Sequence, residues 1–102
     1  MKYNIVISTE AKNDLIEIFK YIAYTLLVPD TAIDQLDRLE SGIQSLNHMP
    51  ERHRVYDNES WQNLRIMPID NYNVFYVTDN DTKTVSIVRV LYGGMNAENT
   101  LK

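Results

Sequence analysis

The stretch that most constrains the fold runs over residues 64–94, where β-branched and aromatic segments alternate with turn residues. Residues 73–78 and 84–91 are rich in Val, Ile, Thr, Tyr and Phe, which suit a pleated, half-buried surface. Residues 79–82 between them read Asp-Asn-Asp-Thr, and Asp and Asn side chains bond their own backbone in tight turns. This pattern predicts an antiparallel hairpin.

A third strand is predicted over residues 64–69, directly before the hairpin. It contains Pro68, and proline lacks the N–H group that a central strand donates to its neighbour. We therefore expect this strand to lie at an edge of the sheet or to end near Pro68.

The first half of the chain has a helical periodicity. Residues 3–7 end in three β-branched residues and predict a short strand, after which Ser8 can cap a helix. Apolar residues then recur every three or four positions up to about Leu27, as on one face of an α-helix: Ala11, Leu15, Ile18, Ile22 and Leu26. A second helix, opened by Pro29 or Asp30, repeats this spacing as far as Leu46. Because the connection is short, the two helices are expected to be antiparallel.

The order of these periodicities predicts an α+β fold. It consists of a strand, an antiparallel two-helix hairpin and then a three-stranded, mostly antiparallel sheet. With 102 residues the chain has room for one modest hydrophobic core, so we predict a single domain over residues 1–102. Residues 95–102 have no periodicity and are expected to form a flexible tail.

The charge balance limits the possible partners. The net charge is −4, whereas nucleic-acid-binding proteins usually carry a basic face because phosphate contacts dominate their affinity. Residues 48–95 contain five Lys/Arg and six Asp/Glu, so any nucleic-acid surface is expected to be local and to lie there. The chain has no cysteine, no signal-peptide pattern and no apolar run long enough to span a bilayer. These features fit a cytoplasmic protein without a membrane partner.

Two arginines lie in strands that are otherwise apolar, which is an unusual place for a solvated charge. Metal-free RNA cleavage needs a base for the 2′-OH, cations for the phosphoryl oxygens and an acid for the leaving oxygen. Guanidinium groups suit the second task because they bind phosphate in a bidentate way. Arg65 and Arg89 are therefore candidate catalytic residues. Alternatively, each arginine caps the sheet edge or pairs with an acid such as Asp70 or Asp79.

Tyr92, at the end of the last strand, is a third candidate catalytic residue. It is suited to act as a base, as an acid or as a stacking platform for a nucleobase, and packing is the alternative role. Strand alternation places Tyr92 and Arg89 on opposite faces of the sheet, unless a bulge re-aims the tyrosine.

A basic and aromatic cluster lies between the helices and the sheet. Its members are Arg52, His53, Arg54, Tyr56 and Trp61. Cations interleaved with aromatic rings are typical of proteins that bind single strands, so the two arginines, the tyrosine and the tryptophan are candidate RNA-binding residues. His53 is a candidate catalytic base because histidine titrates near neutral pH. Alternatively, the cluster is a solvated loop whose charges pair with nearby acids. No metal-ligand spacing is present, so no metal or cofactor is expected.

Motifs along nearly the whole chain resemble the RelE/ParE superfamily of type II toxin–antitoxin toxins. They open the first helix, close the second and fill the last strands: Ser8, residues 11–15, Tyr21-Ile22, Leu46, Pro50, Leu64-Arg65, residues 71–76 and residues 85–94. Many members place an arginine two residues after the first glycine of the last motif. This chain has Met95 there, which weakens the case for full activity.

The resemblance implies one of two activities. RelE-like members are metal-independent endoribonucleases that cut mRNA on the ribosome and inhibit translation, whereas ParE-like members poison DNA gyrase. Both are neutralised by an antitoxin whose C-terminal segment wraps the toxin. The sequence favours the ribonuclease, with Arg65 and Arg89 stabilising the transition state and Tyr92 or His53 moving protons. Gyrase inhibition by protein–protein binding and a catalytically inactive relative are the alternatives. A homodimer or a heterotetramer with the antitoxin is the expected assembly.

Overall fold

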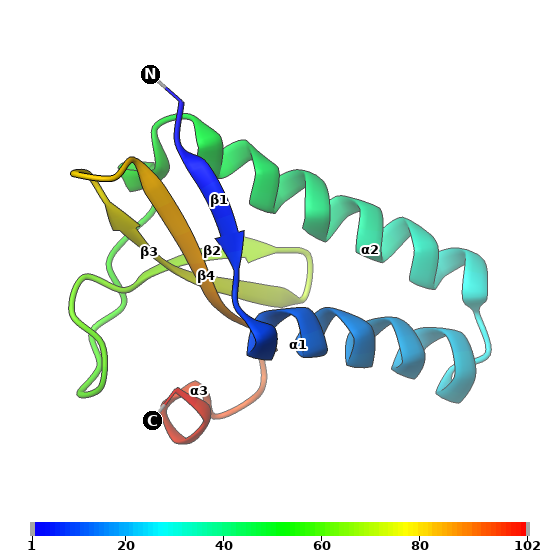
Figure 1. The fold of residues 1–102 in the computed structure, drawn as a ribbon. Coiled ribbons are helices and arrows are strands. Elements are labelled where there is room, and N and C mark those ends of the chain that lie inside the picture. The colour runs from blue at the N-terminus through cyan, green and yellow to red at the C-terminus, as the bar shows by residue number, and fades with distance from the viewer. Residues whose placement is uncertain (1, 102) are drawn as a thin grey trace.

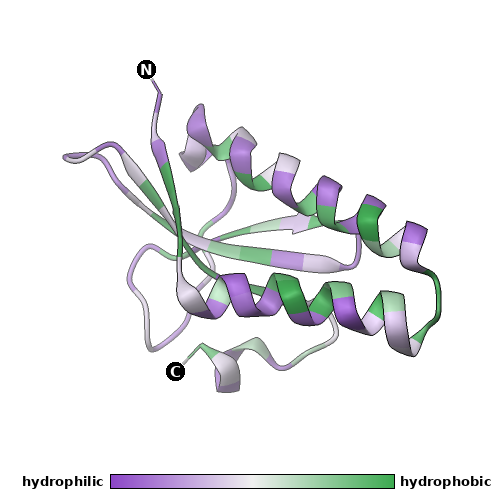
Figure 2. Cartoon of the chain, turned by 45° about the vertical axis from the view of Figure 1, so that its right-hand side comes forward, coloured by the Kyte–Doolittle hydropathy of each residue, from purple (hydrophilic) through white to green (hydrophobic). Residues whose placement is uncertain are grey.

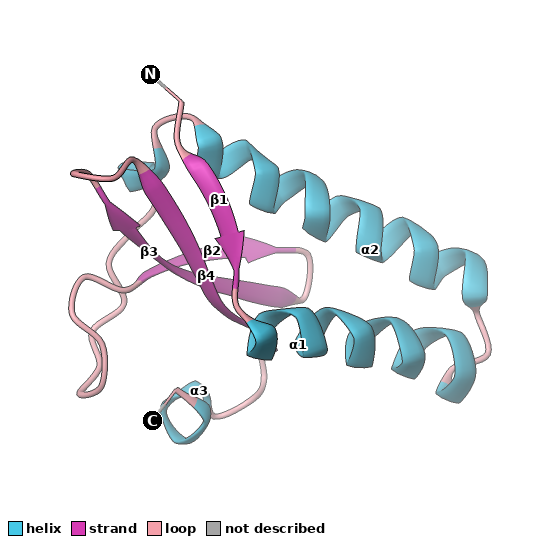
Figure 3. Ribbon diagram, viewed as in Figure 1, coloured by secondary structure: helices cyan, strands magenta, loops and turns pink. Residues whose placement is uncertain are grey.

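The computed structural model describes residues 2–101 and has a helical hairpin packed on one face of a four-stranded sheet (Figure 1). The chain order is β1 (Asn4–Ile7), α1 (Thr9–Lys20), α2 (Pro29–Gln44), β2 (Arg65–Ile69), β3 (Tyr72–Asp79), β4 (Thr84–Tyr92) and α3 (Ala97–Thr100). In Figure 3 the long helices lie on one side of the strands, and the loop before β2 and the short α3 lie away from them. The predicted α+β fold is confirmed.

Each long helix begins as its sequence predicts. The Ser8 side chain accepts a hydrogen bond of 3.0 Å from the Ala11 N–H and caps α1. A π-helical turn, Tyr21–Thr25, continues α1 toward the connection. Leu27 then takes a left-handed conformation with φ of 60°, which reverses the chain before Pro29 opens α2. The two helices therefore form the expected antiparallel hairpin.

The strand order in the sheet is β1-β4-β3-β2. The strands β2, β3 and β4 are antiparallel neighbours, and β1 joins β4 in parallel, with Ile7 opposite Ile87. The strand β2, which contains Pro68, lies at the edge of the sheet as predicted, so the missing N–H breaks no central ladder.

The main core lies between the sheet and the helical hairpin. Its buried members come from α1, from α2 with the turn after it, and from the three longest strands: Ala11, Leu15, Leu39, Ile43, Leu46, Met67, Val74, Tyr76, Val85, Ile87 and Val90. A side chain at Gly42 would collide with Ile69, so this glycine allows α2 to approach β2 closely.

A second apolar cluster covers the opposite face of the sheet. It contains Leu64, Ile66, Phe75, Val88 and Leu91, and Leu101 closes it at 3% exposure. The flexible tail was predicted over residues 95–102, of which the structure describes 95–101. These residues form the short helix α3 and bury Leu101, while residue 102 lies outside the described residues. The physical reason is that no helix of the hairpin covers this face, so the C-terminal segment shields its apolar side chains from water. One leucine after four polar or small residues gave no periodic signal for this packing.

Candidate functional site

Arg89 is held by an acidic side chain of α1. Its Nε and Nη2 atoms donate to the two carboxylate oxygens of Asp14 at 2.7 Å each, and its Nη1 donates to the Thr100 carbonyl at 3.5 Å. The hydrogen bond to Asp14 raises the pKa of the Arg89 guanidinium. The fork of nitrogens that would bind a phosphate is thus occupied within the protein.

The Asp14 carboxylate also completes the edge of β4. The strand β1 ends at Ile7, opposite Ile87, so the later residues of β4 have no strand beside them on that edge. There the Val90 N–H donates to the Asp14 carboxylate at 2.9 Å. Asp14 therefore satisfies one backbone donor and one guanidinium with the same carboxylate. Arg89 thus pairs with an acid, which was the second alternative considered for it, although the acid is Asp14 and not Asp70 or Asp79.

Arg65 binds the loop that precedes β2. Its Nη1 donates to the carbonyls of His53 at 2.6 Å and of Glu51 at 3.1 Å, and its Nη2 lies 3.6 Å from the Glu51 carboxylate. Only 20% of the Arg65 side chain is exposed. This arginine fixes the backbone of residues 51–53 on the sheet.

His53 lies against the sheet beside Arg65. Its ring meets Tyr76 edge to face at 6.4 Å, and the Tyr76 hydroxyl donates to the Pro50 carbonyl at 2.6 Å. Burial, followed by the charge of Arg52, lowers the pKa of His53, and burial raises the pKa of Tyr76 to about 12. For His53 both effects favour the neutral ring over the charged one.

Three of the four candidate RNA-binding residues make local contacts, each of a different kind. Arg52 donates to the carbonyls of His48 and Met49 at the end of the helical segment, at 2.6 and 3.1 Å. Tyr56 packs edge to face on Phe75 at 5.2 Å. Trp61 donates from Nε1 to the Leu101 carbonyl at 2.9 Å, and Arg54 has an exposed side chain.

The structure does not bring Arg65 and Arg89 to one point. Arg65 lies in the edge strand β2 and Arg89 in β4, with β3 between them. Two strand spacings separate their backbones by roughly 10 Å. Each side chain also turns toward a partner on its own edge, so the structure pairs Arg65 with His53 and Arg89 with Asp14.

A bulge in β4 explains how Arg89 reaches the edge. Phe75 pairs with Arg89 and Tyr76 with Ile87, so Val88 is an extra residue on β4. The Arg89 side chain lies at the rim between the two faces and lines a groove on each. Tyr92, beyond the bulge, packs on Tyr72 at a centroid distance of 6.0 Å.

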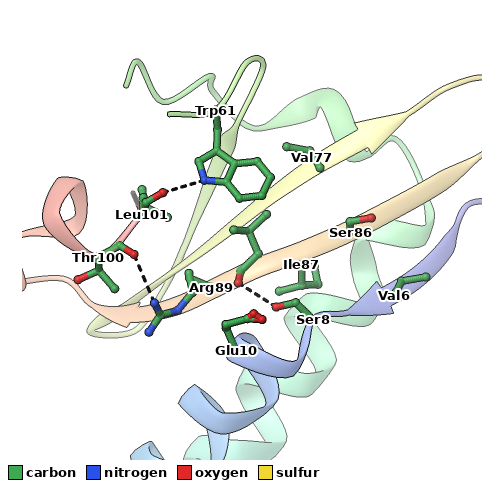
Figure 4. A pocket seen from close by; sticks show the side chains of 11 residues that line it. Val6, Ser8, Glu10, Trp61, Val77, Ser86, Ile87, Arg89, Thr100 and Leu101 are labelled. Carbon is green, nitrogen blue, oxygen red and sulfur yellow. Dashed lines mark hydrogen bonds between the residues drawn. The ribbon is translucent and has the colours of Figure 1, made fainter. Parts of the chain in front are cut away.

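The groove on the open face of the sheet has a volume of about 500 Å³ (Figure 4). Val6, Trp61, Val88 and Leu101 are among its lining residues. As Figure 4 shows, hydrogen bonds from Trp61 to Leu101 and from Arg89 to Thr100 tie the C-terminal segment along one side. This groove is therefore formed in part by the end of the chain.

A second groove, of about 700 Å³, lies between the helical hairpin and the ends of β3 and β4. We call it the hairpin groove, and it is lined among others by Glu17, Tyr21, Leu26, Tyr72, Tyr92 and Met95. Of this set, only Tyr92 was predicted to be a site residue, whereas Tyr21, Leu26, Tyr72 and Met95 entered the predictions only through helical periodicity or family motifs. Tyr21 and Tyr72 lie far apart in the sequence, and the one available signal was the exposed position of Tyr21 beside the apolar stripe of α1.

Within residues 2–101 no group of three or more His, Asp or Glu side chains is arranged to hold a metal ion. No helix of these residues is long and apolar enough to cross a membrane.

Comparison with known proteins defines the class. The family model of the ParE toxin of the type II toxin–antitoxin system parDE matches residues 5–97. The chain therefore belongs to the ParE toxin family, within the RelE/ParE superfamily that its motifs resemble. No curated protein sequence matches it significantly.

Solved structures share the fold at low sequence identity. A chain of the chromosomal ParDE system from P. aeruginosa has a TM-score of 0.73 and 13% identity, covering 89% of this chain and 96% of that one. A chain of the RelBE2 toxin–antitoxin complex from Mycobacterium tuberculosis has a TM-score of 0.65 and 20% identity, covering 90% of this chain and 99% of that one. A mutant of the E. coli toxin RelE in the free state has a TM-score of 0.67 and 10% identity, covering 99% of this chain and 94% of that one. At these identities the likeness establishes the fold alone.

Proposed function

We propose that this toxin acts in the cytoplasm by binding DNA gyrase through protein–protein contacts, and that a cognate antitoxin neutralises it. The observation that carries the proposal is the engagement of Arg89, whose guanidinium is held in a bidentate way by Asp14. A nuclease needs this cation at the scissile phosphate, and Arg65 is likewise bound to backbone carbonyls.

Releasing Arg89 toward RNA has a high cost. Asp14 and Arg89 are mostly buried, with side chains 13% and 23% exposed. Breaking a buried pair by removing one partner typically costs roughly 3–5 kcal/mol. Release would also leave a carboxylate facing the rest of the acidic α1. These contacts favour a structural role for Arg89 at the edge of the sheet over a role in binding a substrate.

The hairpin groove supports a protein-binding role. Tyr21, Leu26, Tyr92 and Met95 are each at least 50% exposed on its rim. Tyrosine and methionine are enriched in protein–protein interfaces, whereas the net charge of −4 opposes an RNA surface. Membership of the ParE family points in the same direction.

Ribosome-associated mRNA cleavage is the second candidate. One observation favours it: His53 lies beside Arg65, and its lowered pKa favours the neutral ring, which is the form that accepts a proton. In that mechanism Tyr92 stays on the opposite side of β3 and takes no direct part.

Parallel assays distinguish the two functions. The purified protein is added to relaxed plasmid with gyrase, and separately to a translating ribosome extract with a labelled mRNA. We expect loss of supercoiling and an intact mRNA, with gyrase activity restored when the antitoxin is added. Cleavage of ribosome-bound mRNA with undiminished supercoiling would establish the nuclease instead. An Arg65→Ala variant that still inhibits gyrase is the matched control.

A further inference from the structure

We infer that the hairpin groove receives an amphipathic helix of the target protein, which inserts an arginine or lysine between Tyr21, Tyr72 and Tyr92 beside Glu17. This inference rests on the proposed function, because it requires that the target is bound as a protein. It adds the place of binding and the chemistry of the segment that binds.

The three tyrosines come from separate elements and meet at one end of the groove. Tyr21 opens the π-helical turn after α1, Tyr72 begins β3, and Tyr92 ends β4. The Tyr72 and Tyr92 rings are 6.0 Å apart at an angle of 73°. Burial raises the pKa of Tyr72, and the nearby Tyr21 and Tyr92 hydroxyls raise it further, which reflects how closely the phenols approach one another.

The backbone beside the hairpin groove has two unusual conformations. A π-helical turn is rare and is frequent at functional sites, and Leu27 adopts a left-handed conformation that is unfavourable for a branched side chain. Leu26, Leu27 and Val28 are all exposed there. In Figure 2 this connection between the long helices is strongly hydrophobic along its length. Exposed apolar residues that are grouped in this way mark interaction sites.

The charges around the groove select a basic partner. Glu17 lines it, and among residues 2–101 this carboxylate has no ion-pair partner. Among the described residues, Arg89 is the only cation that lines the groove, and Asp14 already neutralises it. Residues 1–47 carry seven Asp/Glu against four Lys/Arg. A cation over tyrosine faces and near a carboxylate gains both cation–π and ionic attraction.

The apolar residues that line the hairpin groove indicate which other side chains the bound helix carries. Ile18, Ile22, Leu26, Val28 and Met95 line the groove beside the tyrosines. An amphipathic helix laid in an apolar groove buries side chains at i, i+3, i+4 and i+7. The segment therefore combines apolar residues at that spacing with one cation that faces the tyrosines. A nucleic acid fits poorly, because residues 2–101 offer its phosphates no unpaired cation in this groove.

The test compares tyrosine variants of the whole toxin. Tyr21 and Tyr92 are 54% and 55% exposed, so Tyr21→Ala and Tyr92→Ala leave the core intact. Each variant is expected to weaken gyrase inhibition roughly tenfold and the double variant roughly 100-fold, as for aromatic hot spots. Tyr24→Ala is the matched control, because Tyr24 is 69% exposed on the same turn and does not line the groove. Circular dichroism verifies that each variant is folded, and antitoxin titration is kept as a separate readout.

Charge reversal tests the cation separately. Glu17→Lys is expected to weaken inhibition about tenfold, whereas Glu40→Lys, on an exposed α2 position outside the groove, leaves it unchanged. Tyr21→Phe and Tyr92→Phe keep the ring faces and are expected to keep inhibition.

Each outcome assigns a failure to one hypothesis. If the unmodified toxin leaves gyrase active, the proposed function is wrong. If it inhibits gyrase and the double tyrosine variant inhibits equally, the groove inference is wrong. The inference is also overturned if the double variant keeps inhibition and loses antitoxin affinity, because the groove then belongs to the antitoxin. A changed oligomeric state of the double variant would assign the groove to a second copy of the chain.

Discussion

Arg65 and Arg89 occupy similar places in the sequence, each inside an apolar strand, yet the fold holds them in different ways. Arg89 is bound by a carboxylate through two bonds of 2.7 Å, and the same carboxylate also accepts the Val90 N–H. Arg65 is bound mainly by two backbone carbonyls, and its ionic contact with Glu51 is 3.6 Å long. Each strand arginine thus connects its strand to a neighbouring segment. Arg89 binds the carboxylate of α1 that also accepts the Val90 N–H, whereas Arg65 binds the backbone of the loop that precedes β2.

The largest effect is expected from removing the carboxylate at the β4 edge. Asp14→Ala removes the acceptor of Arg89 Nε, of Arg89 Nη2 and of the Val90 N–H, so the free energy of unfolding falls by roughly 3–5 kcal/mol. Urea denaturation measures it, and Glu17→Ala, an exposed carboxylate of the same helix, is the control with a change within about 0.5 kcal/mol. A loss of less than about 1 kcal/mol would show that the pair contributes no more than a surface salt bridge does.

A smaller effect is expected at the β2 edge. Arg65→Ala removes bonds to the Glu51 and His53 carbonyls and lowers the free energy of unfolding by roughly 1–3 kcal/mol. Hydrogen exchange should increase mainly in residues 50–56, because this arginine fixes that loop. Arg54→Ala, an exposed neighbour, serves as the control. A loss as large as that of Asp14→Ala would remove the difference between the two edges.

The C-terminal segment is held by hydrogen bonds from both Trp61 and Arg89, and a substitution of the tryptophan separates the two contributions. Trp61→Phe removes the bond from Nε1 to the Leu101 carbonyl and leaves the Arg89 contact with Thr100 in place. The free energy of unfolding is expected to fall by about 1 kcal/mol, with faster exchange confined to residues 97–101. If the exchange of these residues is unchanged, Arg89 and the burial of Leu101 hold the segment without the tryptophan.

The smallest effect is expected in the pH dependence of stability, and it concerns His53 at the β2 edge alone. The pKa of His53 is lowered in the folded state, so folding favours the neutral ring. This contribution to stability is fully present above the unfolded pKa of about 6.5 and is lost as the pH falls through that value toward the folded pKa. Urea denaturation between pH 8 and pH 5 should show the decrease, and His53→Phe should remove it. A decrease of the same size in the His53→Phe variant would assign it to other groups.

The sequence by itself determined the local elements. The alternation of β-branched residues predicted β3 and β4, the four- and three-residue spacing predicted the long helices, and Pro68 predicted the edge position of β2. These are effects of residues within a few positions of one another, so they are visible in a single chain. Ser8 as the cap of α1 belongs to the same class.

The tertiary structure decided the partners. Asp14 and Arg89 are 75 positions apart, and nothing in the spacing of either strand or helix connects them. The expected partners of the strand arginines were Asp70 and Asp79, yet Asp70 accepts from Arg38 at 2.7 Å. Which acid meets which arginine depends on where β1 stops along β4, and this is a property of the sheet register rather than of the local sequence.

The same reason explains the two grooves. Residues 95–102 gave no periodic signal, but the open face of the sheet provides an apolar surface on which Leu101 is buried. Tyr21, Tyr72 and Tyr92 gather only because the π-helical turn, the start of β3 and the end of β4 meet at one end of the molecule. Local propensity determines which elements form, whereas burial of apolar surface between distant elements determines which side chains they bring together.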